Sequence, residues 1–232
     1  GGEAEDEENV KVEIQTIVYE SIVNVTDVVF ERNTAGRGGA ILLSNTKDYS
    51  ITNVRFEGNS ATEESYGGGA IYSTASSGKL SDIIFKNNTS HKGGAVALHT
   101  KSQMTITSMT AKGNVATASL DEKGASVYGV GGVFYVNDSI LKLEESENKN
   151  IVIGGEGDDA NKAVSGGAIY AELGAGAPEI IISGADLIGN ESTYLQNGGY
   201  NSEYGGGAIY ISNGSITLSG VKISGNKSDY YG

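Results

Sequence analysis

The heptapeptide YGGGAIY occupies residues 66–72, and the same seven letters return at residues 204–210. A single active site does not require the same heptapeptide at two places in the chain, so the duplication indicates a structural repeat. A shorter form, two glycines followed by Ala or Val and then a bulky apolar residue, occurs six times. The copies lie at 38–41, 68–71, 93–96, 131–134, 166–169 and 206–209.

A second repeated element alternates with the first and ends in asparagine. Apolar residues stand eight, five and three positions before each asparagine, Ser or Thr stands seven before it, and Asp, Asn, Ser or Gly stands six before it. Such alternation of period two, interrupted by a turn residue, is typical of short β-strands. The asparagines are Asn33, Asn59, Asn88, Asn114, Asn190 and Asn226.

One copy departs from this template. The segment IVIGGE at 151–156 places Ile151 and Ile153 in the two apolar positions, but Glu156 stands where asparagine is expected. The extra residues EESEN, at 144–148, lie just upstream. We therefore expect a bulge in this copy and a gap in the asparagine series.

The spacing of the two elements predicts the architecture. From each glycine pair to the next asparagine position the chain runs 20 to 25 residues, whereas the return distance varies more widely. A near-constant segment of short strands plus one variable loop predicts an all-β fold, a right-handed parallel β-helix (solenoid) of about seven coils with variable loops at one corner. We expect the glycines to allow close approach between coils. The asparagines should form a structural ladder, in a position that tolerates left-handed backbone.

The alternating GGA[ILV] and FxxN motifs resemble the repeats of the chlamydial polymorphic membrane proteins. FxxN is strict in three copies, and later copies place Ala111, Leu187 and Ile223 at the Phe position. The resemblance implies a β-helical autotransporter passenger that lies on the cell surface and acts as an adhesin. The chain departs from those passengers, which often carry cysteine, because it contains none. The strict pairs are Phe30/Asn33, Phe56/Asn59 and Phe85/Asn88.

Composition argues against several classes of function. A formal net charge of −13 opposes binding to nucleic acid, and no apolar run is long enough for direct membrane insertion. The strands after the glycine pairs hold one charged residue, Glu172, and the only arginines, Arg32, Arg37 and Arg55, lie near one end. Glycoside hydrolysis needs two facing carboxyl groups. We therefore expect no catalytic residues, no cofactor and no metal, and we interpret GGEGDD at 154–159 as an ordinary glycine-rich loop and not a calcium site.

Tyrosine marks the candidate binding surfaces. One strand register holds four tyrosines, which should point outward as an aromatic stripe that either holds a sugar or peptide or simply stabilises neighbouring coils. The long loops 115–130 and 191–205 contribute four more among Ser, Asn and Gly, a mixture suited to binding loops on a rigid scaffold. The alternative for these loops is a tolerated insertion. The stripe residues are Tyr72, Tyr135, Tyr170 and Tyr210, and the loop residues are Tyr128, Tyr194, Tyr200 and Tyr204.

We therefore expect residues 1–232 to form one β-helix segment of a longer passenger. Residues 1–21 would form an acidic N-terminal cap or first coil, and residues 22–232 would form the repeat coils. The favoured function is adhesion at the cell surface or in secreted form, with a host or partner-cell surface protein or glycan as ligand. A structural stalk or filament that self-associates through the β-helix ends is the alternative, and a carbohydrate-active enzyme is the third reading. We expect the export signal and any translocator domain to lie outside this chain.

Overall fold

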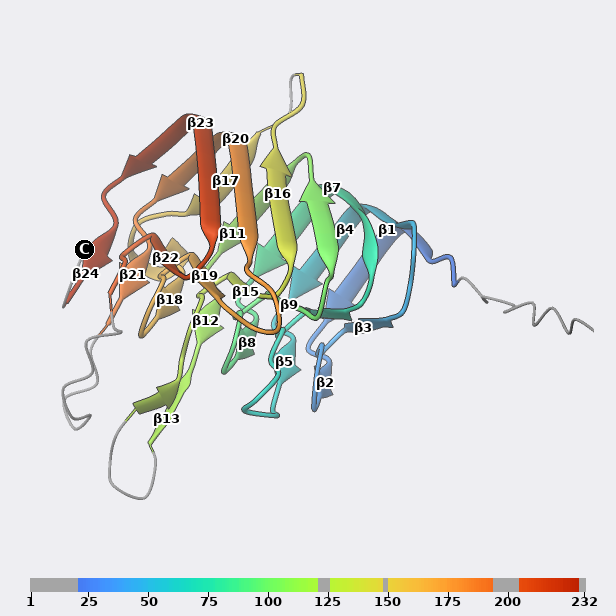
Figure 1. The fold of residues 1–232 in the computed structure, drawn as a ribbon, viewed down its shortest axis with the longest axis horizontal. Coiled ribbons are helices and arrows are strands. Elements are labelled where there is room, and N and C mark those ends of the chain that lie inside the picture. Colours follow the sequence, from blue (N-terminus) through green and yellow to red (C-terminus); the bar gives the residue numbers. More distant parts are fainter. Residues whose placement is uncertain (1–20, 121–125, 148–149, 194–204, 230–232) are drawn as a thin grey trace, which may run out of the picture.

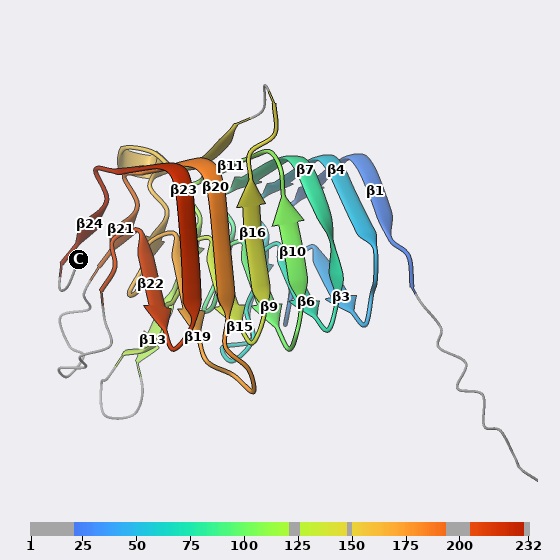
Figure 2. The same cartoon turned by 45° about the horizontal axis from the view of Figure 1, so that its top comes forward.

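The computed structural model describes residues 21–120, 126–147, 150–193 and 205–229 of the chain. The chain winds as a parallel β-helix, because strands of successive turns pair in parallel and stack into three long sheets (Figures 1 and 2). The all-β parallel fold predicted from the repeats is thus confirmed. Seven stacked levels are seen in the sheet of shortest strands. Within the described ranges the only helix is the 3₁₀ turn η1 (Gly157–Asp159).

Each of the three sheets takes one segment of the repeat. The GG sheet holds the strands that follow the glycine pairs: β3 (Ile41–Ser44), β6 (Ile71–Thr74), β9 (Val96–His99), β15 (Phe134–Asn137), β19 (Ile169–Glu172) and β22 (Ile209–Ser212). The short sheet holds the residues that follow the asparagines: β2 (Thr34–Ala35), β5 (Ser60–Ala61), β8 (Thr89–Ser90), β12 (Val115–Ala116), β18 (Lys162–Ala163), β21 (Glu191–Ser192) and β24 (Lys227–Ser228).

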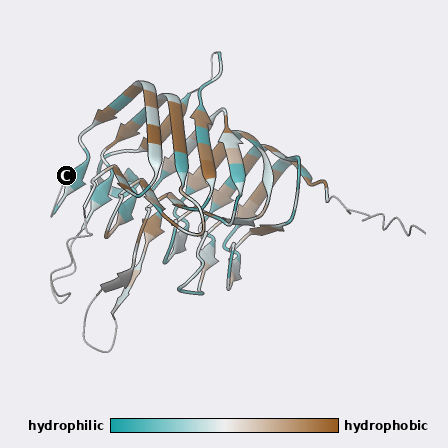
Figure 3. Ribbon diagram, in the orientation of Figure 1, coloured by the Kyte–Doolittle hydropathy of each residue, from teal (hydrophilic) through white to brown (hydrophobic). Residues whose placement is uncertain are grey.

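The long sheet holds the residues that precede the asparagines. Its strands are β1 (Asn24–Glu31), β4 (Tyr49–Glu57), β7 (Ser77–Lys86), β10 (Gln103–Ile106), β11 (Met109–Lys112), β16 (Ile140–Glu144), β17 (Ile151–Gly154), β20 (Glu179–Ile188) and β23 (Ser215–Ser224). Apolar residues gather on these strands, whereas the links between strands are more polar (Figure 3).

The turn residue six positions before each asparagine bends the long strands. Asp27, Asn53 and Asp82 have φ of 57°, 53° and 57°, the left-handed region that Asp and Asn tolerate, and glycine fills the position in the last two levels. Ser108 occupies it in the fourth level, and there the strand divides into β10 and β11. In the fifth level an insertion between β16 and β17 divides the strand as well, so the long strands stay whole only where Asp, Asn or Gly forms the bend without extra residues.

The two glycines of each pair are required for different reasons. The first glycine adopts left-handed backbone in all six copies, for example φ 72° at Gly68 and 63° at Gly93. The second glycine lies against the backbone of the next level, so that a Cβ on Gly94 would stand 2.2 Å from the carbonyl oxygen of Gly132. No side chain fits at such a distance, and this explains why the glycine pair is repeated in every copy.

The asparagines form the predicted ladder. In each step the Nδ2 of one asparagine donates to the Oδ1 of the next, at 2.9 Å from Asn88 to Asn114 and 3.0 Å from Asn59 to Asn88. The same Nδ2 also donates to a carbonyl one level back, as from Asn88 to Phe56 at 3.0 Å. The expectation of left-handed backbone at these asparagines was wrong. That conformation belongs to the residue just before, for example Gly58, Asn87 and Gly113.

The gap expected at Glu156 does not exist, because Asn161 fills it. Asn114 donates to the Oδ1 of Asn161 at 3.0 Å, and Asn161 donates to the Oδ1 of Asn190 at 2.9 Å. The extra residues between Ile153 and Asn161 form a compact turn that contains η1. The ladder therefore runs unbroken from Asn33 to Asn226.

The core lies inside the coil, where the apolar positions of the template stack level on level. The rings of Phe30, Phe56 and Phe85 stack with centroids 5.2 Å apart in both steps. Inward side chains of the middle levels, such as Leu141 and Leu187, have no exposed surface. Besides the two long loops, extra residues also lie at other corners, between β16 and β17 and between β19 and β20.

Candidate functional site

The tyrosine register predicted from the sequence exists on the outer face of the GG sheet. Tyr72 pairs with Ala97, Tyr135 with Tyr170, and Tyr170 with Tyr210 in adjacent strands. The rings of Tyr135 and Tyr170 stack with centroids 6.0 Å apart, and those of Tyr170 and Tyr210 are 5.0 Å apart. This geometry is the stacked column that the period of the repeat predicted.

The column is not an open stripe, because most of it is covered. Tyr72 is 4% exposed, Tyr135 1% and Tyr170 8%. Tyr66 packs edge-on against Tyr72, and Val130 contacts the same cluster. Burial leaves no face of Tyr135 for a sugar or peptide to stack on, so the geometry favours the stabilising role for this part of the column.

A histidine that the sequence analysis passed over completes the column. Ala97 leaves a gap between Tyr72 and Tyr135, and the ring of His99 fills it, with centroids 5.1 Å from each of the two tyrosine rings. Its Nε2 lies 3.0 Å from the carbonyl oxygen of Tyr66. Because a carbonyl only accepts, Nε2 carries the proton. Burial lowers the pKa of His99 to about 4, so the ring is neutral at pH 7.

Glu172 anchors the polar edge of the column. The hydroxyl of Tyr135 donates a short hydrogen bond to Glu172, and the hydroxyl of Tyr170 donates to the other carboxylate oxygen at 3.1 Å. Lys92 lies 3.9 Å from Glu172 and donates to the Tyr135 hydroxyl at 3.3 Å. Desolvation and the neighbouring Glu172 carboxylate raise the pKa of Tyr135, so it stays protonated. The hydroxyls of Tyr135 and Tyr170 and the ammonium group of Lys92 thus all lie around the carboxylate of Glu172. Such an arrangement is typical of a structural network.

A second ion pair holds the link that covers Tyr72. Arg37 binds Glu63 through two bonds, Nε to Oε2 at 2.6 Å and Nη2 to Oε1 at 2.9 Å. Its guanidinium also lies 3.3 Å from the centroid of the Tyr66 ring. The hydrogen bond to Glu63 raises the pKa of Arg37, and the same bond lowers the pKa of Glu63. Arg37 and Lys92, the two basic residues of these networks, each stand just before a glycine pair. This shared position was the signal in the sequence that could have identified them.

The long loop at 115–130 contains a β-hairpin. Strands β13 (Ala118–Leu120) and β14 (Ser126–Tyr128) pair antiparallel, the only antiparallel pairing among the described residues. The hairpin projects from the rod beyond the short sheet (Figure 1). Tyr128 ends β14. Tyr194, Tyr200 and Tyr204 lie outside the described residues, so their binding role stays a prediction.

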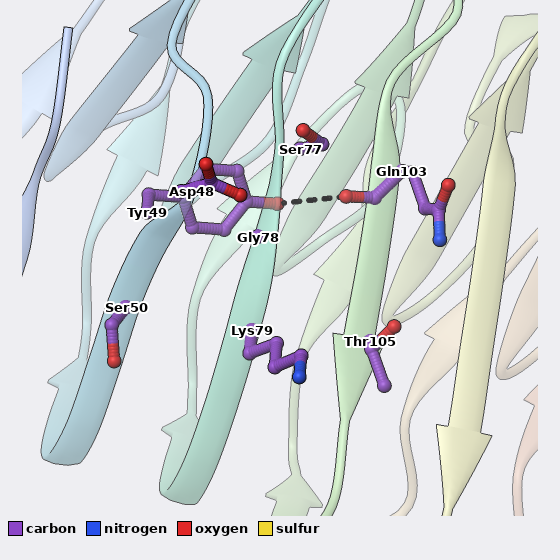
Figure 4. Close-up of a pocket in the computed structure, with 8 residues that line it drawn as sticks. All are labelled: Asp48, Tyr49, Ser50, Ser77, Gly78, Lys79, Gln103 and Thr105. Atoms are coloured by element: carbon purple, nitrogen blue, oxygen red, sulfur yellow. Dashed lines mark hydrogen bonds between the residues drawn. The ribbon is translucent and has the colours of Figure 1, made fainter.

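An open groove of about 420 Å³ lies over β4, β7 and β10 (Figure 4). Below its floor the ring of Tyr49 is 1% exposed and packs against Gly78, where a Cβ would stand 2.4 Å from ring atoms. The Tyr49 hydroxyl donates to the carbonyl of Gln103 at 3.4 Å, and burial raises its pKa. The polar side chains around the groove suit a hydrogen-bonding ligand. They are Asp48, Ser50, Ser77, Lys79, Gln103 and Thr105.

Neither a metal site nor a membrane helix was found in the part of the chain that the structure describes. No group of three His, Asp or Glu side chains there is placed to hold a metal ion. In the same residues, no helix has the length and apolarity that crossing a bilayer requires.

Comparison with known proteins matches the repeats that form the first three levels. Residues 27–44, 53–74 and 82–98 match the family described as Chlamydia polymorphic membrane protein (Chlamydia_PMP) repeat. Each matched segment runs from the bend of a long strand, through a ladder asparagine, into a strand of the GG sheet. The resemblance to polymorphic membrane protein repeats is thus confirmed.

A stretch of 74 residues is 45% identical to a protein of Escherichia coli (strain K12) named "Probable autotransporter YfaL". The stretch represents 29% of this chain and 6% of that protein. No solved structure gives a significant match to the chain. The chain therefore carries repeats like those of autotransporter passengers, and it resembles a small part of one such protein.

Proposed function

We propose that this chain is a segment of a cell-surface or secreted passenger, and that it binds a protein or glycan of a host or partner cell through elements projecting from a rigid β-helix. The polymorphic membrane protein repeats and the autotransporter relative support the location. The shape of the molecule supports the mode of binding, because loops on rigid scaffolds carry much of protein recognition.

The observation that carries this proposal is the β13–β14 hairpin. An isolated two-stranded hairpin is marginally stable, so a projecting one needs a firm base. Here Thr117 donates its N–H to Ser90 at 2.7 Å, Gly129 donates to His91 at 2.9 Å, and Val164 donates to Gly129 at 2.6 Å. The hairpin is thus held by the levels before and after it. The Thr117 bond is the one that Thr62 and Thr193 also make in their levels, so the base of the hairpin continues the regular pairing of the rod.

The chain supplies its own design for removing the hairpin. Two residues, His91 and Lys92, link Ser90 to the next glycine pair in the level before, and Lys92 pairs with Val130 across the levels. Deletion of residues 118–129 leaves Thr117 and Val130 as the same two-residue link. The core and the ladder of this variant are unchanged. We expect it to fold and to lose binding.

The test measures saturable binding of the purified chain to epithelial cells, with and without residues 118–129. A matched variant lacking 194–204 leaves Thr193 beside Gly205, the spacing found at Val164 and Ser165. Loss of binding in either variant, with unchanged circular dichroism, assigns the contact surface. If the intact chain does not bind, or if a variant lacking both segments binds as well as it does, the proposal is wrong.

A tyrosine test refines the second loop. Replacing Tyr194, Tyr200 and Tyr204 together by serine keeps the loop length and removes the aromatic contact area. We expect weaker binding if these tyrosines meet the ligand. As a matched control, Tyr19, which also lies outside the described residues, is replaced by serine and is expected to leave binding unchanged.

We also propose that the chain has no catalytic role. Glu172, the one charged residue of the GG strands, is bound by two tyrosine hydroxyls and lies beside Lys92. A general acid or base needs access to substrate, whereas the carboxylate oxygens of Glu172 already accept hydrogen bonds from its neighbours. Incubation with acidic polysaccharides, read by reducing-end release, should show no turnover, and turnover lost in Glu172→Gln would overturn this part.

A further inference from the structure

Two cavities on the outside of the rod share a side chain and together form one trough. The groove over β4, β7 and β10 meets, at Gln103, a second cavity of about 220 Å³ that Lys101 and Asp138 help to line. In the register of the long sheet, Gln103 stands between Ser77 of the level before and Ile140 of the level after. The trough therefore runs along the axis of the rod from β4 to β16, which is about 15 Å at the usual spacing of paired strands.

The second cavity contains a buried carboxylate without a partner. Asp138 follows strand β15 with left-handed backbone, φ 48°, and is only 8% exposed. No described residue donates a hydrogen bond to its side chain or forms an ion pair with it. A buried charge is costly unless it is paired, and buried polar groups are almost always hydrogen-bonded. The donors for this carboxylate are therefore expected from water or from a ligand.

A loop of mostly small residues lies against Asp138. Two residues separate β15 from β16, whereas six, at 173–178, separate β19 from β20 at the same corner (orange in Figure 2). A Cβ on Gly176 would stand 2.2 Å from the Oδ1 of Asp138, and one on Gly174 would stand 3.0 Å from its Cβ. The two glycines thus let the backbone of the loop approach the carboxylate closely. Ala177 lines the cavity and is exposed, so the cavity remains accessible from outside.

The other polar groups of the trough also lack partners within the fold. The side chains of Ser77, Gln103 and Thr105 are half-buried and make no hydrogen bond with any described residue. Lys79 and Lys101 are exposed and form no ion pair with any of these residues. The trough therefore combines unused donors, on the lysines and the glutamine, with unused acceptors.

The charges of the trough select the class of ligand. Lys79 and Lys101 would repel a cationic partner, whereas Asp48, Asp138 and the net charge of −13 would repel a polyanion. A hydroxyl group both donates and accepts hydrogen bonds, so it can bind a carboxylate and an ammonium group alike. A neutral ligand rich in hydroxyl groups therefore fits this surface best.

We propose that the trough binds a neutral oligosaccharide, whose hydroxyl groups donate to the carboxylate of Asp138 and accept from Lys101 and Gln103. The sugar chain lies along the axis of the rod, across the strands of the long sheet. This site goes beyond the proposed function, because it lies on a different surface from the β13–β14 hairpin and cell binding through the projecting elements does not require it.

Isothermal titration calorimetry tests the intact chain against neutral oligosaccharides of glucose, galactose, mannose and N-acetylglucosamine. We expect saturable binding of at least one of them. Oligogalacturonate and oligolysine, the anionic and the cationic probe, should not displace the bound sugar. A variant that lacks both 118–129 and 194–204 should bind the sugar as the intact chain does, which separates this site from the contact surface for cells.

Asp138→Asn tests the role of the carboxylate. Asparagine keeps the shape of the side chain and tolerates left-handed backbone, so the variant should fold. We expect the sugar to bind about tenfold more weakly, because a hydrogen bond to a charged group is lost. The unliganded variant should be more stable than the intact chain in urea unfolding, because an unpaired buried charge is removed. The matched control, Asp27→Asn, makes the same change at φ 57° in the bend of β1, outside the trough, and should leave sugar binding unchanged.

The proposal is wrong if none of the neutral sugars binds, if a charged probe displaces the sugar, or if Asp138→Asn binds as tightly as the intact chain. A loss of stability in Asp138→Asn would show that the carboxylate has a partner within the fold, and this result would also overturn the proposal.

Discussion

The middle and the ends of this rod follow one template in different surroundings. Asn114 lies between two levels and has no exposed surface, whereas Asn33, at the same template position, lies in the first level and is exposed. Leu187 is fully buried, and Ile223, next to it one level on, is 45% exposed. In a solenoid each level contacts only its neighbours, so stability is close to a sum of nearest-neighbour terms. The same substitution should therefore cost much in the middle and little at an end.

The largest difference is expected in the asparagine ladder. Asn114→Ala removes two bonds that Asn88 donates to its Oδ1 and two that its own Nδ2 donates, to Phe85 and Asn161. The buried backbone N–H of Asn88 loses its acceptor, and Phe85 and Asn161 each lose one donor, so we expect a loss of about 4 kcal/mol in the free energy of unfolding. Asn33→Ala removes a single side-chain donation to Asn59 and should cost about 1 kcal/mol.

Urea unfolding followed by circular dichroism measures both values. Equal losses for Asn114→Ala and Asn33→Ala would show that the rod does not behave as a sum of levels. A small loss at Asn114 would show that water replaces the missing amide, which its full burial argues against.

The second glycine of the pair gives the next contrast. A Cβ on Gly94 would stand 2.2 Å from the carbonyl oxygen of Gly132 in the next level, and both backbones are fixed by further levels. We expect Gly94→Ala to cost about 3 kcal/mol, as overpacking of a tight site does. On Gly207 the three atoms nearest to a Cβ all belong to the backbone of Lys227, which lies in the last level and is able to shift. Gly207→Ala should cost about 1 kcal/mol.

Thermal unfolding of the two glycine variants at one protein concentration checks this contrast. If Gly207→Ala proves as costly as Gly94→Ala, the last level is as rigid as the inner ones, and the freedom assigned to it is wrong.

The ladder shows how far the sequence predicts this fold. Six rungs follow from the constant spacing before each asparagine. Asn161 was missed because inserted residues displace it from that spacing. A second signal marked it, since Asn161 precedes its glycine pair, Gly166 and Gly167, by the same distance as Asn33 and Asn88 precede theirs. Spacing measured from one side fails where that side holds an insertion, and spacing from the other side remains informative.

The tyrosine column shows where sequence reasoning ends. The period of the strands places Tyr135 and Tyr170 outside the coil, and they are there. Their burial depends on Tyr66, His99 and Val130, which come from links and from another register. Whether a link folds over a sheet face depends on its conformation, which no strand period encodes. The hairpin inside 115–130 was hidden for the same reason.

The two histidines of the chain extend the contrast to pH. His99 lies in the buried column, near Lys92, Arg37 and Glu172, whereas His91 lies in a link at the base of the hairpin. The pKa of His99 falls to about 4 in the folded chain, below that of the unfolded chain, so the unfolded state binds more protons between these values. Stability therefore rises with pH there and is lost as the pH falls from about 6.5 towards 4.

The lowered pKa of His99 should reduce the free energy of unfolding by roughly 2 kcal/mol at pH 5. The measurement is urea unfolding at pH 7 and pH 5. His99→Gln should lose less stability between the two pH values than the intact chain. Identical pH dependence in the intact chain and in His99→Gln would show that His99 is not buried as a neutral ring.

The smallest contrast separates exposure from position. Ile84, on the side of a middle level, is 42% exposed, and Leu218, in the last level, is 45% exposed. Ile84 points away from the axis, so Ile84→Thr should change the free energy of unfolding by at most about 0.5 kcal/mol. Leu218 faces the axis and packs over the level below it, so Leu218→Thr should cost about 1 kcal/mol in dilute solution. Urea unfolding of the two variants measures this contrast, and equal losses would show that the inward direction of the Leu218 side chain adds nothing to stability at a given exposure.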